Sequence, residues 1–215
     1  MPTDAQTDLL ALVQWMSPAF PLGSFAYSHG FEAAVNMGQV TDAESLEAWC
    51  RAILIHGSGH NDAVLLAATR NGAELGAMES LAEALASCPE RLEETRAQGR
   101  AFIETTNAIL GTDSAPLALP VAVGLQSRRL QSLSTETVLA LYLQSFVGNL
   151  VQCTIRYVPL GQSAGHAVLN RLAPVIARCA RELAEATADD LASAAFGADL
   201  AAMAHEHQEV RVFRT

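Results

Sequence analysis

Residues 135–157 read TETVLALYLQSFVGNLVQCTIRY, and no charged side chain lies between Glu136 and Arg156. Apolar residues recur there with the spacing of an α-helix, and Ser134 and Thr135 are suitable caps for its first turn. A helix without charge on any face is typical of an interior position, because water would otherwise meet apolar surface on every side. The stretch therefore predicts a long helix that is buried on most sides.

A row of small and uncharged polar residues runs along this predicted helix. Its members recur at helical spacing and so share one face: Ser145, Gly148, Asn149 and Gln152. Buried amides need hydrogen-bond partners or water. One interpretation is a set of satisfied core polar groups, with Gly148 allowing a close helix contact. The alternative is that the row lines a wet passage or a subunit interface.

On both sides of this stretch the chain shows helical periodicity, and no segment alternates convincingly as a strand. Prolines and glycines separate the periodic segments, and patterns such as the capping box Thr41-Asp-Ala-Glu44 open new helices. We expect an all-α fold, a single-domain bundle of about nine to ten helices over residues 1–215, with an N-terminal arm at 1–7 and a C-terminal tail at 206–215. The expected helices are Asp8–Met16, Ser24–Gly38, Thr41–His56, Asn61–Arg70, Glu74–Ser87, Pro89–Leu110, one from Leu117 or Pro120 to Leu130, Thr135–Tyr157, Ser163–Ala186 and Asp190–His205.

Residues 17–36, SPAFPLGSFAYSHGFEAAVN, combine a rigid turn with reactive side chains. Two prolines and a glycine make Ser17–Gly23 a stiff turn, and Ser24 is a suitable cap for a helix that ends at Gly38. This helix would carry four aromatic or ionisable side chains: Phe25, Tyr27, His29 and Glu32. Such side chains are costly to leave half exposed, so we expect that something covers them.

The C-terminal tail has the composition of a contact surface. Residues 208–215, QEVRVFRT, combine Arg211 and Arg214 with Phe213 and branched apolar residues. A chain end is usually disordered unless it docks. Arginine next to an aromatic anchor is typical of the energetically important centre of a protein interface.

Composition excludes several classes of protein. The formal net charge of −10 would repel the phosphate backbone of nucleic acids. All 13 basic residues are Arg, so a Walker A phosphate loop, a Schiff-base enzyme and a lysine general base are absent. Within the helix that begins at Pro89, we expect Arg91, Glu94 and Arg100 to face water.

The expected environment is the cytoplasm. The first residues lack the basic start of a signal peptide, and the longest apolar run, Val138–Leu143, is too short to span a bilayer. Four scattered cysteines are expected to be reduced core residues: Cys50, Cys88, Cys153 and Cys179.

No metal, cofactor or catalytic site is predicted. His56 and His60 are four apart but have two glycines between them, His205 and His207 would point apart on a helix, and the remaining histidines His29 and His166 stand alone. Transient contact with nickel stays open, since imidazole is a competent ligand for that ion. The sequence Gly161-Gln-Ser-Ala-Gly165 matches the pattern of a serine nucleophile, but a chance match is expected because no strand precedes it.

Three separated segments resemble motifs of the UreF family of urease accessory proteins. The first is the turn Pro21-Leu-Gly-Ser-Phe25 followed by Gly30-Phe-Glu32. The second is Ser145-Phe-Val-Gly-Asn149-Leu-Val followed by Arg156-Tyr-Val-Pro-Leu-Gly-Gln162. The third is Met203-Ala-His205-Glu-His-Gln208 followed by Arg211-Val-Phe-Arg-Thr215, where His207 and Thr215 replace the more common Thr and Ser. The resemblance covers essentially the whole chain.

The resemblance implies an all-α, non-catalytic accessory protein that works in nickel insertion into apo-urease without a cofactor of its own. Members of this family form homodimers and bind UreD, also called UreH. Together these recruit the GTPase UreG, whose hydrolysis UreF is thought to time, and UreF is thought to contribute internal passages for the ion. In the family the tail becomes ordered when UreD binds.

On this basis we expect partner contacts from both terminal motifs and from two further positions: Phe25, Tyr27, His29, Glu32, Asp62, Gln162, Arg211, Phe213 and Arg214. No contact with nucleic acid or membrane is expected. Two other functions stay open. A small all-α enzyme would use His29 and Glu32 as an acid–base pair on one helix face, and a nickel store would use the histidines.

Overall fold

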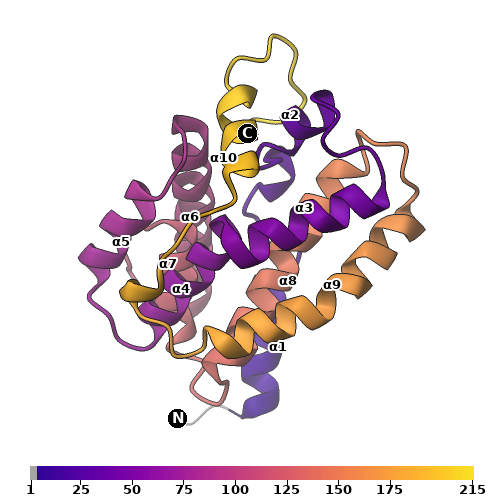
Figure 1. Cartoon of the computed structure of the whole chain (residues 1–215). Helices are drawn as coiled ribbons and strands as arrows, with labels where there is room; N and C mark the ends of the chain where they lie inside the picture. The colour runs from indigo at the N-terminus through magenta and orange to yellow at the C-terminus, as the bar shows by residue number, and fades with distance from the viewer. Residues whose placement is uncertain (1–3) are drawn as a thin grey trace.

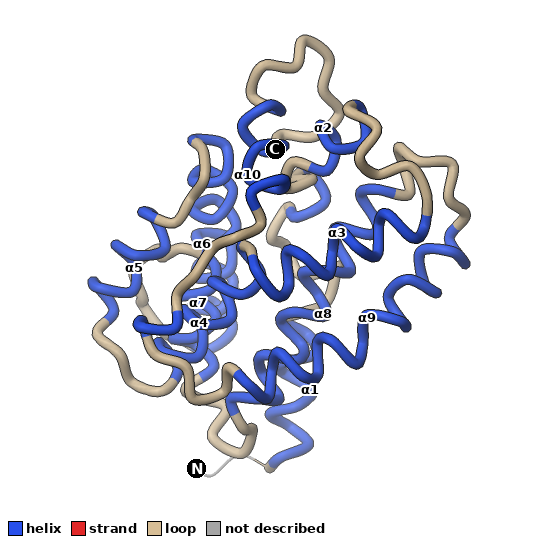
Figure 2. The backbone as a smooth tube through the Cα atoms, viewed as in Figure 1, coloured by secondary structure: helices blue, strands red, loops and turns tan. Residues whose placement is uncertain are grey.

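The structure, a computed structural model, describes residues 4–215 and is all-α there, as predicted (Figure 1). Figure 2 shows helices joined by loops, with no strand in this range. The α-helices are α1 (Ala5–Trp15), α2 (Phe31–Asn36), α3 (Ala43–His56), α4 (Ser58–Arg70), α5 (Leu75–Ala84), α6 (Pro89–Leu110), α7 (Leu119–Ser127), α8 (Thr135–Thr154), α9 (Gln162–Glu182) and α10 (Phe196–His205). Two 3-10 helices, η1 (Ser24–Ala26) and η2 (Ala188–Asp190), complete the set for residues 4–215.

Helix α8 confirms the prediction of a long interior helix. Ser134 caps it by accepting a hydrogen bond from the amide of Thr137, and among the residues of α8 only Glu136 is exposed. The helix packs extensively against α9 and also contacts α3 and α4 (Figure 1). Its buried aliphatic residues therefore form the middle of the main core, where removing them from water stabilises the bundle.

The expected helix from Ser24 to Gly38 is wrong in its first half. After η1, Tyr27 is extended, and both His29 and Gly30 have positive φ angles, 60° and 79°. Helix α2 begins only at Phe31. The reason lies in α10, because a β-carbon on Gly30 would come within 2.7 Å of the backbone nitrogen of Ala202. Glycine permits both this approach and the left-handed conformation.

Helix α6 corrects the expectation that Arg91, Glu94 and Arg100 share a wet face. Arg100 is exposed, but Glu94 is buried and the Arg91 side chain is only 11% exposed. The two buried side chains form an ion pair. The side of α6 that carries Arg91 and Glu94 faces other parts of the chain rather than water, so the charge pattern alone was misleading.

Several helix boundaries also differ from the expected ones. Asp42 and Ser45 form the capping box of α3, one residue later than the Thr41 pattern suggested. Gly57 alone separates α3 from α4, and its extended backbone packs so that a β-carbon would lie 2.8 Å from the β-carbon of Ala195. The last expected helix, from Asp190, is instead η2, an extended segment and then α10.

The ends of the chain differ in how much of them is described. Residues 1–3 of the predicted N-terminal arm lie outside the described range, and residues 5–7 form the first turn of α1. The C-terminus lies beside α2 and α10 (Figure 1). None of the helices within residues 4–215 combines the length and the apolar composition that crossing a bilayer requires.

Candidate partner-docking site

The C-terminal tail folds back onto the N-terminal motif. The amide of Arg214 donates to the carbonyl of Ala26 at 2.7 Å, and the amide of Ser28 donates to the carbonyl of Thr215 at 2.7 Å. Phe213 is buried, with its ring 5.8 Å from that of Tyr157. The tail is therefore a packed part of this structure, and together with the helices around it covers Tyr27, His29 and Glu32 of the motif, whereas Phe25 stays 40% exposed.

Glu32 is the carboxylate on which the tail rests. Its side chain is fully buried and accepts the amides of Val212 at 3.0 Å and Phe213 at 2.9 Å. The Tyr157 hydroxyl also donates to it, and Nε2 of His205 lies 3.4 Å away. Burial alone would raise the pKa of Glu32, but the hydrogen bonds, led by that from Tyr157, lower it below its ordinary value. Glu32 is thus held as an anion.

A second buried carboxylate, Glu94, holds the end of the tail. The Thr215 hydroxyl donates to it at 2.7 Å, Gln98 donates at 3.1 Å, and Arg91 pairs with it. Nδ1 of His29 lies 3.6 Å from Oε1 of Glu94, the oxygen that also accepts from Gln98. Burial opposes ionisation of Glu94, but the charge of Arg91 and the contacts with His29 lower its pKa to about 2. Sequence reasoning missed this residue because its partners come from four other positions in the chain.

His29 is part of this interior and not of a helix face. Its Nε2 lies 2.5 Å from the Ser58 hydroxyl, and its ring meets that of Phe146 edge-on at 5.2 Å. Burial, followed by the charge of Arg91, lowers the pKa of His29. Because His29 precedes α2 and has different partners from Glu32, the acid–base pair imagined on one helix face is not formed.

The N-terminal residues predicted to contact partners are placed unequally. Tyr27, His29 and Glu32 are buried, whereas Phe25 is 40% exposed and has Arg156 over its ring at 5.5 Å. In this conformation only Phe25 among the four is accessible to another protein. Gln162, at the start of α9, is exposed.

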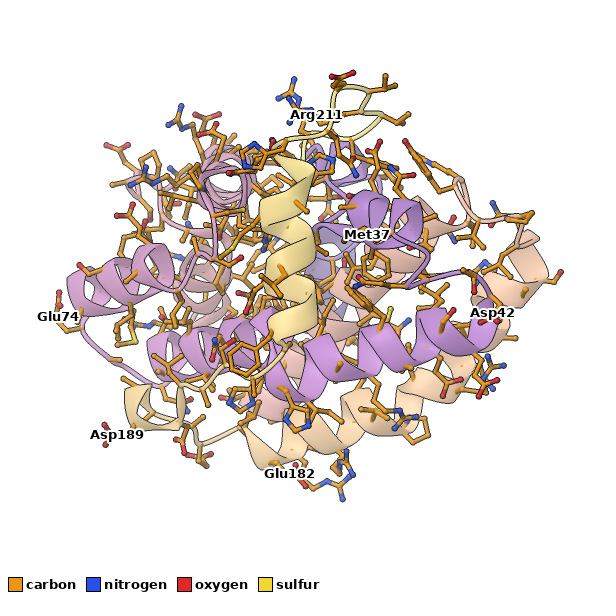
Figure 3. All side chains as sticks on the ribbon, turned by 45° about the horizontal axis from the view of Figure 1, so that its top comes forward. Met37, Asp42, Glu74, Glu182, Asp189 and Arg211 are labelled. Atoms are coloured by element: carbon orange, nitrogen blue, oxygen red, sulfur yellow. The ribbon has the colours of Figure 1, made fainter. Side chains whose placement is uncertain are left out.

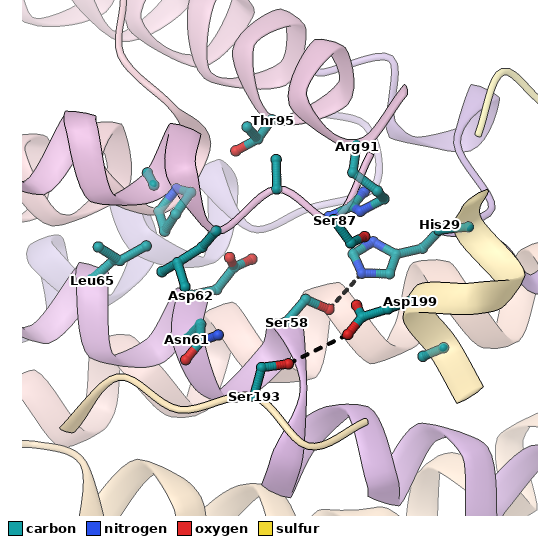
Figure 4. A pocket seen from close by; sticks show the side chains of 16 residues that line it. His29, Ser58, Asn61, Asp62, Leu65, Ser87, Arg91, Thr95, Ser193 and Asp199 are labelled. Carbon is teal, nitrogen blue, oxygen red and sulfur yellow. Dashed lines mark hydrogen bonds between the residues drawn. The ribbon is translucent and has the colours of Figure 1, made fainter. Parts of the chain in front are cut away.

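Asp62 lines a small polar pocket of about 50 Å³ together with His29, Arg91 and Asp199 (Figure 4). The pocket lies between α4, α6 and α10, and Asp62 is half-buried in its wall. Burial raises the pKa of Asp62 to about 6, although the charge of Arg91 and the Tyr142 hydroxyl, which donates to it at 2.8 Å, oppose the shift. A carboxyl with such a pKa can exchange a proton near neutral pH.

The polar row of α8 lines a larger, mainly apolar groove of about 630 Å³ beside α1 and α9. The Ser145 hydroxyl donates to the carbonyl of Met16 at 2.9 Å, and the Asn149 amide donates to that of Ser24 at 3.1 Å. Gln152 lies in the groove wall. A β-carbon on Gly148 would meet nothing within 4 Å, so close helix packing does not explain this glycine.

An exposed apolar row on α10 escaped the sequence reasoning, although its helical spacing was visible. Phe196, Leu200 and Met203 are 69%, 63% and 42% exposed, and the row is followed by the exposed Val210 and Val212 of the tail. Arg211, in the loop after α10 (Figure 3), pairs with Glu90, and Arg214 is exposed. Solvent-exposed apolar side chains grouped with arginine are typical of protein contact surfaces. We call α10 and residues 206–215 the α10–tail face.

The histidines and cysteines are dispersed. His56 ends α3 and His60 lies in α4, where its Nε2 is 2.9 Å from the carbonyl of Asp190. His205 is buried between Glu32 and Glu90. Within residues 4–215 no group of three or more His, Cys, Asp and Glu side chains is arranged to hold a metal ion. All four cysteines are buried and free, as expected.

Comparison with known proteins gives a consistent result. The UreF family model matches residues 40–173. Urease accessory protein UreF of Cereibacter sphaeroides is 52% identical over 96% of this chain and 98% of its own length. The proteins of the same name from Dinoroseobacter shibae and Ruegeria pomeroyi are 48% identical over 96% of this chain and 98% of their length, and 40% identical over 100% of both, respectively. The chain belongs to the UreF family.

Proposed function

We propose that this chain is a urease accessory protein that serves nickel incorporation into apo-urease as a non-catalytic scaffold in the cytoplasm. It binds UreD, also called UreH, and recruits and regulates the GTPase UreG during assembly of the metal centre. Family membership supports the general role. The exposed α10–tail face is the structural observation that carries the scaffold proposal.

The α10–tail face suits a protein partner better than a small molecule. Its apolar side chains project from the exposed side of α10, where they can enter grooves on the surface of another protein. Arg211 and Arg214 lie on the same tail and offer planar donors at the edge of the apolar row. Phe25, the accessible residue of the N-terminal motif, supplies a further aromatic contact.

Regulation of UreG follows from differential binding. Docking that favours one nucleotide state of the GTPase shifts its equilibrium by the difference between the two binding free energies. In this proposal the scaffold acts as a homodimer and couples hydrolysis to metal transfer without reacting itself.

The interior supports a route for a transient Ni²⁺ ion. Glu94 and Tyr142 reach the large groove, while His29 and Asp62 reach the small pocket. The Tyr142–Asp62 hydrogen bond and the Glu94–His29 contact join the two sets of side chains. Carboxylates and imidazoles are ligands that nickel accepts.

A single charge on the α10–tail face tests the scaffold proposal. Leu200→Asp places a carboxylate in the middle of the apolar row and is expected to weaken binding of purified UreD by at least about tenfold. Ile109→Asp, on an exposed apolar residue at the end of α6, is the matched control. Urease activation in cells should fall with Leu200→Asp alone. Equal UreD affinity of Leu200→Asp and the wild type would refute the proposed face.

A further inference from the structure

We propose that Glu32 is not a partner contact but a positioning residue, an internal clamp that fixes the tail in the shape that a partner reads. This inference rests on the proposed function, because the partner is the protein that docks on the α10–tail face. Its basis is the geometry of the clamp.

The clamp joins parts of the chain that are far apart in sequence. Glu32 belongs to α2, Tyr157 follows α8, His205 ends α10, and the two amides come from the tail. An ionised carboxylate only accepts hydrogen bonds and has room for about four of them. Tyr157 and the two tail amides donate to Glu32 and Nε2 of His205 lies beside it, so the carboxylate sets the relative position of all four parts.

The clamp holds the tail by its backbone and leaves side chains free for a partner. The Val212 amide points to Glu32, while the Val212 side chain is 68% exposed. Phe213 points the other way, into the core beside Tyr157. The chain bends at residues 212 and 213, so that both successive amides reach the same carboxylate while the two side chains diverge. Arg211, just before the clamp, is thereby placed beside Glu90 on the surface.

A second anchor prevents the tail from pivoting about Glu32. Thr215 is buried, its carbonyl accepts from Ser28, and its hydroxyl donates to Glu94. Two fixed points three residues apart determine the path between them. Release of the tail would also remove one donor from Glu94, whose other neighbours are Arg91, Gln98 and His29.

The negative charge of Glu32 is essential to this arrangement. A glutamine of the same shape has one acceptor oxygen and would turn an NH₂ group toward N–H and O–H donors. A buried donor left without an acceptor costs free energy, and it would recover its hydrogen bond by moving to water. The expected response to Glu32→Gln is therefore release of the tail and not collapse of the bundle, whose core is formed by other residues.

Amide hydrogen exchange and UreD titration together test the clamp. In Glu32→Gln, exchange of the hydrogen-bonded tail amides of residues 212–214 should rise at least about tenfold, and the affinity for purified UreD should fall about tenfold. Glu44→Gln, an exposed glutamate at the start of α3, is the control. Unchanged exchange or unchanged affinity in Glu32→Gln would overturn the inference.

A second variant tests the same bond from the other side, without altering the core. Val212→Pro removes the amide that donates to Glu32 and changes only an exposed side chain. Val212→Ala removes the same exposed side chain but keeps the amide, so it is the control. We expect Val212→Pro to reproduce the affinity loss of Glu32→Gln and to bind UreD more weakly than Val212→Ala; equal affinities of these two variants would contradict the clamp. Wild-type protein that does not bind UreD at all would refute the proposed function instead, while the exchange result would still decide whether Glu32 holds the tail.

Discussion

Glu32 and Asp62 both turn a carboxylate toward the interior, yet their surroundings move their pKa values in opposite directions. Glu32 is met by two amides, a phenol and an imidazole, and its pKa is lowered. Asp62 has the Tyr142 hydroxyl and a pocket wall, and burial raises its pKa to about 6. The comparison teaches that burial raises the pKa of an interior carboxylate, and that enough hydrogen-bond donors can reverse this shift and keep the group a fixed anion.

Deletion of Arg211–Thr215 is the most severe test of this difference between Glu32 and Asp62. The deletion removes two of the donors to Glu32 and the hydroxyl that meets Glu94, but no donor to Asp62. We expect an intact helical fold and complete loss of urease activation, because the docking face loses both its arginines and its fixed shape. Circular dichroism and urease assays in cells measure the two effects. Normal urease activity at a normal level of the truncated protein would count heavily against the assignment.

The two carboxylates should change the pH dependence of stability in opposite directions. Between about pH 4 and about pH 6 the folded protein binds more protons at Asp62 than the unfolded chain does, so this group lowers the free energy of unfolding as pH rises. Asp62→Asn does not show this decrease in the free energy of unfolding. Between pH 4 and pH 7 its free energy of unfolding should rise by about 2 kcal/mol relative to that of the wild type, as measured by urea denaturation.

Glu32→Gln should show the opposite trend in the same measurement. Because the pKa of Glu32 is lowered in the folded protein, its anion stabilises the fold at pH values above the ordinary pKa of a glutamate. This stabilisation is lost as pH falls through the pKa of the folded state. The deficit of Glu32→Gln relative to wild type should therefore be largest near pH 7 and shrink in acid. Parallel curves for the two variants would show that the two carboxylates do not differ as described.

The smallest expected effect comes from Tyr142→Phe. Loss of its hydrogen bond to Asp62 should cost about 1 kcal/mol of stability and raise the pKa of Asp62 further, because that bond favours the anion. A carboxyl-carbon NMR titration follows the change directly. Tyr157→Phe is the matched control, since its hydroxyl meets Glu32 and should leave the titration of Asp62 in place. An Asp62 pKa that falls in Tyr142→Phe would contradict this account.

Sequence patterns predicted those parts of the fold that local forces determine. The uncharged stretch of α8, the cap at Ser134 and the proline at the start of α6 all act within a few residues, and each was interpreted correctly. The backbone of His29 and Gly30 was not, because α10 imposes it from the other end of the chain. A helical pattern cannot reveal a constraint that distant packing supplies.

The candidate site was predictable in composition and not in arrangement. The tail was recognised by its arginines and Phe213, and the N-terminal motif by its aromatic and ionisable residues. That Glu32 faces the tail while Phe25 faces water depends on the positions of Tyr157 and His205, which no spacing encodes. Glu94 was expected in water together with Arg91 and Arg100, and only the fold shows that Glu94 and Arg91 are buried while Arg100 is exposed.

The separation of the clamp's two halves has a consequence for biosynthesis. Glu32 and the Val212 amide are 180 residues apart, so at about 5–20 residues per second a ribosome makes the second roughly 10–35 seconds after the first. During that interval the nascent chain carries a carboxylate whose two tail donors do not yet exist. The contacts of the tail with Glu32 can therefore form only after residues 212 and 213 have been made, and the molecule acquires its docking face only after that point.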